Sequence, residues 1–298
     1  MKTGFWCTVR SLPNHFNRAD LLLALLILCG FALLFVMAIL GRPYWVAYQR
    51  KRVRALAFPA AWRKILRRRV PLVQRLPTDL QLQLKKHMQV FIAEKAFIGC
   101  AGMAITAEVR VVIAAQACLL VLGRPAHYFD NLRQILVYPG AFAVDRATTH
   151  TDGVLQEQRQ ALAGESWSQG QVILSWADCL QGAAVADDGS NVVIHEFAHQ
   201  LDQENGNANG APPRALGDLA HDARRWSAVF HAAYAHLQEQ AHHGSPGLLN
   251  HYGAQDPAEF FAVACEVFFE QPRALALEYP ALYAELRAYF RLDPSNWH

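Results

Sequence analysis

The six cysteines of this 298-residue chain form no Cys-x-x-Cys pair and recur at no regular spacing. A disulfide framework and a cysteine-built zinc site both need paired or regularly spaced cysteines, so neither is expected. Scattered thiols of this kind suit a domain kept in a reducing compartment such as the cytoplasm. The chain also lacks internal repeats and low-complexity segments, and its length suffices for one domain with an appendage.

Acidic residues are missing between Arg42 and Thr78, a stretch that carries eleven Lys or Arg residues. From Asp79 onward there are fourteen Lys or Arg against twenty-four Asp or Glu, so the net charge of +3 hides an acidic globular part. A basic segment beside a membrane helix most simply binds anionic lipid head groups. Direct nucleic-acid binding through residues 67–69 is not expected, because the acidic remainder would repel phosphate.

Charged residues are also absent from residues 21–40, which are almost entirely apolar. About 20 such residues are enough for one helix to cross a membrane. A cleaved signal peptide would have a shorter apolar region followed by a small-residue cleavage site, which the sequence at residues 39–43 does not supply. We therefore expect an uncleaved anchor after an N-terminal tail of residues 1–20. Translation from Met37 would delete this anchor and leave a cytoplasmic protein.

The flanks of this apolar run predict its orientation. More basic residues follow it than precede it, and Tyr44, Trp45 and Tyr48 fit an interfacial aromatic belt. The positive-inside tendency places the C-terminal bulk in the cytoplasm, on a single-pass anchor in the inner membrane. Residues 41–56 are expected to form a basic juxtamembrane linker, and residues 57–298 the globular domain.

A His-Glu-x-x-His motif stands at His195, Glu196 and His199 within an apolar segment. On a helix, the two imidazoles lie one turn apart on one face and can chelate a divalent metal, most often zinc. Glu196 then lies close enough to take a proton from a metal-bound water. The alternative is a pair of core histidines, which would be costly to bury without a ligand or partner.

Two short β-prone runs, residues 134–138 and 171–176, predict strands of a small mixed sheet directly before the motif helix. Residues 148–170 between them predict one or two weaker strands or a hairpin. An extended substrate can pair with a sheet edge, and residues 171–176 are the expected edge, although an ordinary core strand fits equally well. The expected fold is α+β and predominantly helical, with helices over 80–96, 108–122, the motif segment, 214–240 and the segment from Pro257 to before Pro272.

A catalytic zinc site usually has a third protein ligand. The metzincin pattern requires Gly at position 202 and His at position 205, and the chain has Asp202 and Asn205, so that class is excluded. A carboxylate from a later helix is the remaining option. Glu259 is one candidate, but Asp256 followed by Glu259 is also a capping box. Spacing alone leaves open the alternatives Glu266, Asp218 and His221.

Several segments together carry a family resemblance: VVIHEFAHQLDQENG at 192–206, YGAQDPAEFFAV at 252–263, EVFF at 266–269, LVYP at 136–139 and GQVILSW at 170–176. In these segments the chain closely resembles the Mlc titration factor A family of zinc-dependent peptidases, over roughly residue 59 to the C-terminus. The resemblance implies a compact zincin-like domain of the gluzincin type, with a catalytic core similar to that of anthrax lethal factor. The N-terminal anchor is a departure, since the best-known members are soluble cytoplasmic proteins.

The resemblance also implies roles for individual residues. One Zn2+ per chain would be held by His195, His199 and Glu259, with Glu196 as the general base. Tyr252, seven residues before Glu259, would donate a hydrogen bond near the reaction centre; without the resemblance, a packing tyrosine is the better interpretation.

Two further carboxylates can orient a ligand imidazole through its second ring nitrogen. Asp202 lies on the turn after His199, and Glu266 lies two turns beyond Glu259 on the same face; both are equally compatible with plain surface carboxylates.

The expected activity is zinc-dependent hydrolysis of peptide bonds, with small peptides as substrates. A second hypothesis is that the chain chiefly binds and sequesters a transcriptional repressor of the Mlc type, with catalysis secondary. The family name reflects such titration of a repressor. A degenerate metalloprotein with a structural zinc is less favoured, because Glu196 is intact.

Overall fold

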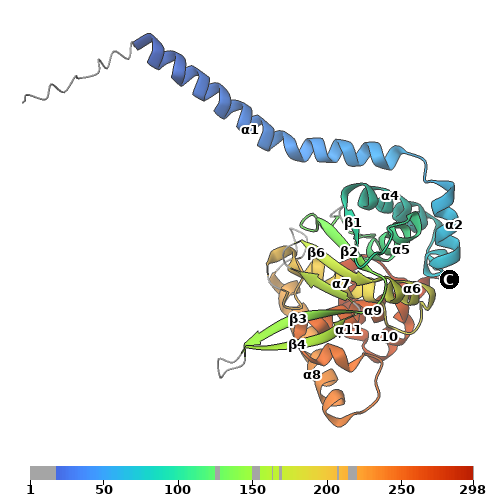
Figure 1. Cartoon of the computed structure of the whole chain (residues 1–298). Helices are drawn as coiled ribbons and strands as arrows, with labels where there is room; N and C mark the ends of the chain where they lie inside the picture. Colours follow the sequence, from blue (N-terminus) through green and yellow to red (C-terminus); the bar gives the residue numbers. More distant parts are fainter. Residues whose placement is uncertain are drawn as a thin grey trace, which may run out of the picture. The chain divides into compact units, whose positions relative to one another are not determined.

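A computed structural model of the chain describes residues 18–124, 128–149, 155–162, 164–167, 170–206, 208–213 and 220–297 (Figure 1). The chain divides into two compact units, one ending at Arg52 and the other beginning at Val53. The candidates Asp218 and the side chain of His221 fall outside the described residues.

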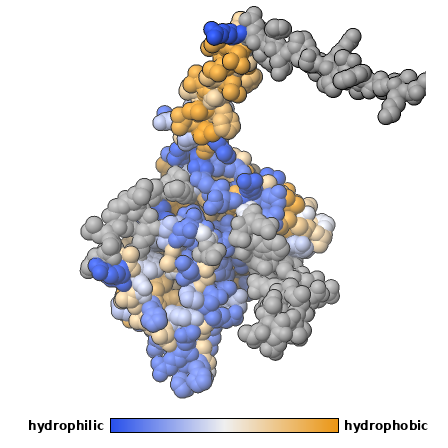
Figure 2. All heavy atoms as spheres, turned by 90° about the vertical axis from the view of Figure 1, so that its left-hand side faces the viewer, coloured by the Kyte–Doolittle hydropathy of each residue, from blue (hydrophilic) through white to orange (hydrophobic). Residues whose placement is uncertain are grey.

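The first unit consists of most of helix α1 (Arg18–Ala55). Every side chain from Leu21 to Leu40 is exposed, and Figure 2 shows hydrophobic residues covering the surface of this helix. By length and composition, α1 is apolar enough to cross a membrane. The segment expected to be a linker, residues 41–56, is helical through Ala55 and includes Pro43.

The second unit begins with three helices separated at Pro71 and Pro77, as proline cannot continue a helix in its interior. These are α2 (Ala60–Arg69), α3 (Leu72–Arg75) and α4 (Thr78–Glu94). The remaining helices are α5 (Ala107–Ala117), α6 (Trp176–Ala184), α7 (Val192–Asp202), α8 (Ala220–His243), α9 (Pro257–Glu270), α10 (Pro272–Glu278) and α11 (Pro280–Phe290), with short 3-10 turns η1 (Gln203–Asn205), η2 (His251–Ala254) and η3 (Pro294–Asn296).

A four-stranded sheet has the order β1-β2-β6-β5, in which the first three strands are parallel and β5 is antiparallel to β6. Its strands are β1 (Ala96–Gly99), β2 (Gln134–Tyr138), β5 (Gly164–Trp167) and β6 (Gln171–Ser175). A separate antiparallel hairpin joins β3 (Phe142–Thr149) and β4 (Leu155–Leu162). The predicted fold is thereby confirmed: the chain is mostly helical, with a small mixed sheet before α7.

The predicted sheet edge is wrong. Strand β6 pairs with β2 on one side and with β5 on the other, so it is an interior strand. Its residues Val172 to Ser175 are buried without alternation, which is the pattern of a strand covered on both faces. The edge next to β6 belongs to the more polar β5, which lies beside α7.

Helix boundaries also differ from the prediction, and α8, for example, ends at His243 instead of at residue 240. Helix α4 ends at Glu94, and β1 begins two residues later without an intervening glycine or proline. Helix α5 ends at Ala117, and the following apolar residues continue as turns rather than as helix. The residues that follow α5 stay buried, so the hydrophobic pattern alone does not mark the end of that helix.

Aromatic packing ties the N-terminal helices and the sheet to α7. The ring of Phe91 on α4 lies 5.6 Å from Phe197 on α7, and Phe129 lies 4.9 Å from the same ring. These residues are fully buried, at roughly 1.5–3 kcal/mol for each large apolar side chain. On its other side α7 packs along α9, whose Phe260 and Phe261 are also buried. The motif helix is therefore held rigidly between the sheet and α9.

Candidate metal centre

The start of α7 is fixed by Asn191, whose side-chain Oδ1 accepts a hydrogen bond from the backbone N–H of Ile194 at 3.0 Å. Val193, Ile194 and Phe197 are completely buried and set the rotation of the helix. Because residues three and four apart share a face, this rotation turns His195 and His199 together toward α9. Local sequence thus positions both imidazoles before any ligand is considered.

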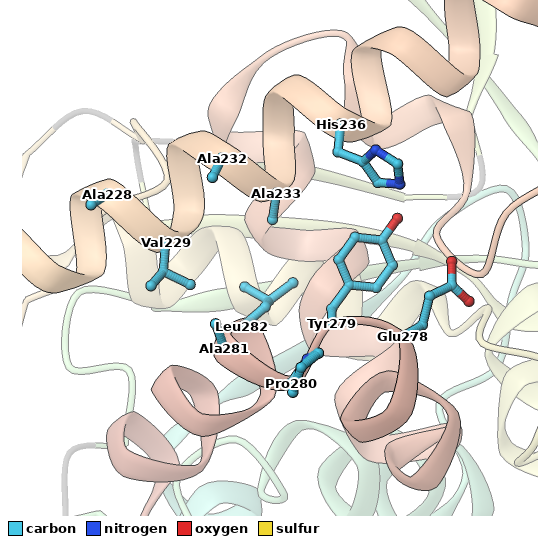
Figure 3. Close-up of a pocket in the computed structure, with 10 residues that line it drawn as sticks. All are labelled: Ala228, Val229, Ala232, Ala233, His236, Glu278, Tyr279, Pro280, Ala281 and Leu282. Atoms are coloured by element: carbon cyan, nitrogen blue, oxygen red, sulfur yellow. The ribbon is translucent and has the colours of Figure 1, made fainter.

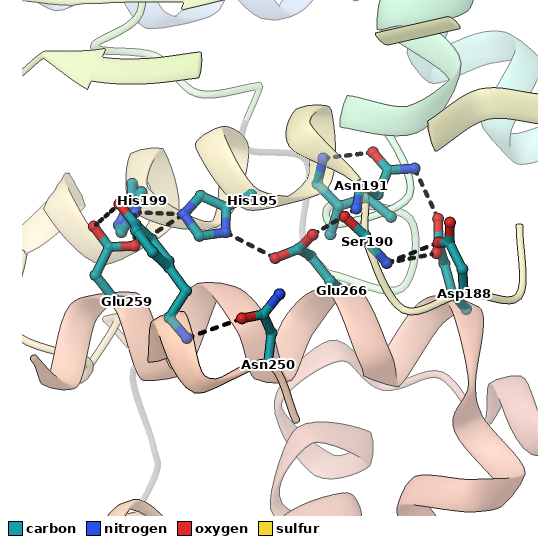
Figure 4. Close-up of polar contacts among 11 residues, drawn as sticks. Asp188, Ser190, Asn191, His195, His199, Asn250, Glu259 and Glu266 are labelled. Carbon is teal, nitrogen blue, oxygen red and sulfur yellow. Dashed lines mark hydrogen bonds and ion pairs between the residues drawn. The ribbon is translucent and has the colours of Figure 1, made fainter. Parts of the chain in front are cut away.

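The start of α9 is fixed by Asp256, whose Oδ1 accepts from the backbone N–H groups of Ala258 at 2.8 Å and Glu259 at 3.0 Å. Pro257 occupies the first helical position, where its missing N–H leaves no bond unmade. The carboxylate of Glu259 does not serve as a cap. It points across to α7, where it meets both imidazoles (Figure 4).

Three ligand atoms converge between the two helices. His195 Nε2 lies 2.9 Å from Glu259 Oε2 and 3.3 Å from His199 Nε2, and His199 Nε2 lies 3.4 Å from the same carboxylate oxygen. Tetrahedral zinc with ligands at about 2.0–2.1 Å sets its ligand atoms about 3.3 Å apart. The residues therefore fit a divalent metal in type and in spacing.

Glu266 lies on the other side of the first imidazole. Its Oε1 is 2.8 Å from His195 Nδ1, and its Oε2 accepts the backbone N–H of Asn191. A carboxylate in this position holds the ring so that Nε2 faces the cluster. Glu266 was an alternative to Glu259 as the third ligand. It contacts the nitrogen of His195 that faces away from the cluster, so it is not one of the three residues that converge there.

Tyr252 belongs to η2 and lies at the rim of the cluster. Its hydroxyl donates to Glu259 Oε1 at 3.5 Å, and its ring centroid is 5.8 Å from that of His195. The side chain is 38% exposed, so its hydroxyl can meet a molecule that enters from solvent.

Asp202 is completely buried at the end of α7. Its Oδ2 accepts the backbone N–H groups of Asn209 and Gly210, each at 2.7 Å, and so fixes the loop that follows the helix. Gly210 has a φ of +75° and lies against the backbone of Pro257, where a Cβ atom would collide. Since Asp202 Oδ1 has no hydrogen-bond partner among the described residues, its orienting role for an imidazole stays a prediction.

The electrostatics of the cluster follow from burial and from the opposed charges. Burial alone would lower the pKa of His195, but the carboxylates of Glu266 and Glu259 outweigh it and raise the pKa well above its ordinary value. Burial would likewise raise the pKa of Glu259, but hydrogen bonds from His195 and His199 hold that pKa below its usual range. Glu196, only 5% exposed, has its pKa raised by burial to about 7.

Sequence reasoning missed a second buried carboxylate, Glu270, which supports the start of α7. Glu270 Oε2 accepts the backbone N–H groups of Gly189 at 3.1 Å and Ser190 at 3.2 Å, and its Oε1 accepts from Asn191 Nδ2 at 2.9 Å. Glu259, Glu266 and Glu270 lie at positions i, i+7 and i+11 of an otherwise apolar helix. That spacing places all three on one face, and it was available from the sequence.

The sequence model of the family described as Glucose-regulated metallo-peptidase M90 matches residues 45–291, which is most of the chain. The chain belongs to this family of metallopeptidases. It is also 40% identical over 255 residues to the uncharacterized protein slr2042 of Synechocystis sp., covering 85% of this chain and 92% of that protein. Mlc titration factor A of Salmonella agona is 34% identical over 230 residues, or 76% of this chain and 84% of that protein. The resemblance to the Mlc titration factor A family is confirmed, and a metal is implied by the family.

Proposed function

We propose that this M90 family member is a zinc-dependent peptidase in which His195, His199 and Glu259 hold the ion. The observation that carries the proposal is the convergence of their three ligand atoms within 4.8 Å of one another between α7 and α9. Two neutral imidazoles and one carboxylate form a common ligand set of catalytic zinc and leave a coordination position open. When bound, zinc would activate a water molecule and polarise the scissile carbonyl.

The remaining roles belong to the residues of the chain. Glu196 stands beside His195 in the sequence and is almost fully buried, so its carboxylate is shielded from competing bulk water. It acts as the general base that takes the proton of the attacking water and delivers it to the leaving amine. The Tyr252 hydroxyl, at the rim, donates a hydrogen bond to the oxyanion that forms at the scissile carbonyl. Glu266 orients His195.

Hydrolysis of small chromogenic peptides by the purified protein tests this proposal. Wild type should cleave them, a chelator should abolish cleavage, and added zinc should restore it. Glu196→Gln should retain the metal and lose about 10²–10⁴-fold in kcat, as expected for removal of a general base. Exposed Glu278→Gln is the matched control and should behave as wild type. Cleavage by Glu196→Gln at the wild-type rate would remove Glu196 from the reaction.

A second candidate function comes from the relative called Mlc titration factor A. By its name that protein titrates Mlc, and this chain would by analogy bind and sequester a transcriptional repressor of that type. A pull-down with His199→Ala, which cannot hold the metal in this account, separates the two functions. Retained repressor binding would support a regulatory role independent of catalysis, and binding lost together with the metal would link it to the peptidase site.

We further propose that residues 21–40 anchor the protein in the cytoplasmic membrane, with residues 57–298 forming the peptidase domain on the cytoplasmic side. The exposed apolar surface of α1 and the basic residues that follow it support this orientation. Fractionation of cells expressing the full chain should place it in the membrane pellet through high-salt washing. A protease added outside spheroplasts should leave the peptidase domain intact. Digestion of that domain would reverse the assigned orientation.

A further inference from the structure

A pocket of about 460 Å³ lies among helices α2, α3 and α4, away from the metal centre. Three basic side chains line it: Arg63 and Arg67 from α2 and Lys85 from α4. Its apolar lining consists of the buried side chains Leu66 and Val73. We name this site the cationic pocket.

The charges of the cationic pocket have no counterions within the described part of the chain. Arg63 donates only to the backbone carbonyl of Phe58, at 3.0 Å, and the side chains of Arg67 and Lys85 take part in no ion pair there. The next two arginines behave differently, because Arg68 and Arg69 both pair with Glu108. Within the run of residues 67–69, Arg67 is thus the arginine without an acidic partner among the described residues, and it is also the one that lines the pocket.

The pocket is held open by side-chain amides rather than by acids. Gln74 Nε2 donates to the backbone carbonyl of Arg67 at 3.1 Å, and Gln81 Nε2 donates to that of Leu76 at 3.0 Å. These bonds tie α2, α3 and α4 together around the opening. Three like charges gathered at a preformed hollow repel one another unless an anion lies between them.

A second cavity of similar size has a different lining. It has about 410 Å³, lies between α8 and the α10–α11 segment, and is lined mainly by apolar side chains such as Val229, Tyr279 and Leu282 (Figure 3). No Lys or Arg lines it, and its one carboxylate is Glu278. Nothing in its lining selects an anion.

We propose that the cationic pocket binds an organic phosphate group, the chemistry shared by anionic phospholipid head groups and soluble phosphate esters. Arg guanidinium groups match phosphate oxygens in paired hydrogen bonds, and Lys adds a point charge. The volume is in the range of about 300–1,000 Å³ that is usual for small-molecule sites.

The lipid is the favoured source of this phosphate. Arg63 follows the end of the apolar run at Leu40 by twenty-three residues, so a membrane anchor would keep the pocket within reach of lipid head groups. The apolar contacts offered by Leu66 and Val73 suit the glycerol end of a lipid, and the acid-free segment 42–78 favours an anionic surface. The choice of a lipid rests on the proposed membrane anchor, whereas the phosphate site itself depends on neither the anchor nor the metal centre.

Binding is tested on the full chain in a neutral detergent, by native mass spectrometry with three probes. These are dioctanoyl phosphatidic acid, zwitterionic dioctanoyl phosphatidylcholine and glycerol 3-phosphate. Wild type should bind one phosphatidic acid and discriminate against phosphatidylcholine. The double variant Arg67→Gln with Lys85→Gln should bind phosphatidic acid at least about tenfold more weakly, because two charged contacts are lost. Arg68→Gln, which removes an equal charge outside the pocket, is the matched control and should bind like wild type.

Several outcomes decide between the sources. Glycerol 3-phosphate binding as tightly as phosphatidic acid, with the same loss in the double variant, supports the site and assigns it to soluble esters. Equal weakening by Arg68→Gln would show diffuse surface charge and overturn the proposal, as would unchanged binding in the double variant. A short oligonucleotide that displaces phosphatidic acid and binds more tightly would overturn it in favour of nucleic acid. Arg63→Gln provides a second variant if the double variant fails to show a wild-type melting transition.

Discussion

Histidine side chains are largely buried in two regions of this molecule, and the groups that surround them differ. On α4, His87 is 5% exposed and its ring centroid lies 5.3 Å from that of Tyr128, and its Nδ1 has no hydrogen-bond partner within the described residues. Burial, together with the charge of Arg54, lowers the pKa of His87 to about 4, so this imidazole is neutral. On α7, His195 and His199 face each other and a shared carboxylate.

The contrast shows what distinguishes a histidine that fills space from a histidine that binds. An isolated buried imidazole becomes neutral and behaves as a small aromatic residue. Two imidazoles whose Nε2 atoms lie 3.3 Å apart, with a carboxylate oxygen beside both, bring together three ligand atoms between which a cation fits. The carboxylates of α9, rather than burial itself, therefore give α7 a cluster that could hold a metal ion.

The largest expected effect is the loss of bound metal when a residue of the α7–α9 cluster is replaced, compared with no loss when the buried His87 is replaced. His199→Ala should reduce bound metal from about one ion per chain to nearly none, and Glu259→Ala should do the same, because three-ligand sites seldom tolerate loss of one ligand. His87→Leu should retain the full metal content. Plasma emission analysis of the three purified variants measures this directly. Full zinc retention in Glu259→Ala would return the third-ligand role to Glu266 or another residue.

A smaller effect is expected from the carboxylate behind His195. Glu266→Gln keeps the size of the side chain but removes the charge that holds Nδ1, so metal affinity should fall by about 10–100-fold. Competition with a coloured chelator gives the dissociation constants of wild type and variant. An unchanged constant would mean that Glu266 supports only the start of α7 through Asn191.

The pH dependence of the free energy of unfolding tests whether His87 on α4 is neutral in the folded protein. In the unfolded chain His87 titrates near pH 6.5, and in the fold only near pH 4, so acidification favours proton uptake by the unfolded state. The stabilisation by the neutral ring is complete above pH 6.5 and is lost as the pH falls toward 4, by about 3 kcal/mol. His87→Leu should lack this component of the acid loss. Urea unfolding of the metal-free proteins at pH 7 and pH 4 tests it, and equal losses in both proteins would contradict it.

The smallest effect is expected at the cap of α7. Asn191→Ala removes the cap and a donor to Glu270, and should lower the free energy of unfolding by about 1–2 kcal/mol while also weakening metal binding. Thr106→Ala removes the cap of α5 and should lower stability by about 1 kcal/mol without any change in metal affinity. Thermal denaturation and zinc titration of both variants separate the two effects. An unchanged metal affinity in Asn191→Ala would show that the cap of α7 does not contribute to metal binding.

Much of the site was predictable because its signals are local. The apolar spacing around His195 and the Asp256-Pro257 start of α9 each identify a helix from a few neighbouring residues. Which carboxylate of α9 faces which nitrogen was not predictable from spacing, because Glu259 and Glu266 lie on the same face. Their assignment depends on the register of α9 against α7, which is a tertiary property. The family resemblance implied beforehand only the ligand role of Glu259, whereas Glu266 was one of two carboxylates expected to be able to orient an imidazole.

The sheet was less predictable than the site, because the pairing of strands depends on segments that are distant in the sequence. Strands β2 and β6 were predicted because each is a compact apolar run. The segment 148–170, which contains β5, was predicted only as one or two weaker strands or a hairpin, because β5 is polar and short and its antiparallel pairing with β6 is a tertiary property. The same reasoning explains Asp202. Its position after His199 suggested a contact with an imidazole, but the backbone N–H groups of a loop that follows in the sequence occupy its Oδ2.

X-ray absorption at the zinc edge of the loaded full chain tests the central claim most directly. The account predicts only nitrogen and oxygen neighbours at about 2.0–2.1 Å, with the multiple-scattering pattern of two imidazoles, and loss of one imidazole signal or of the metal in His199→Ala. A sulfur neighbour at about 2.3 Å would mean that buried thiols such as Cys179 or Cys265 hold the ion, and would contradict a centre built from His195, His199 and Glu259.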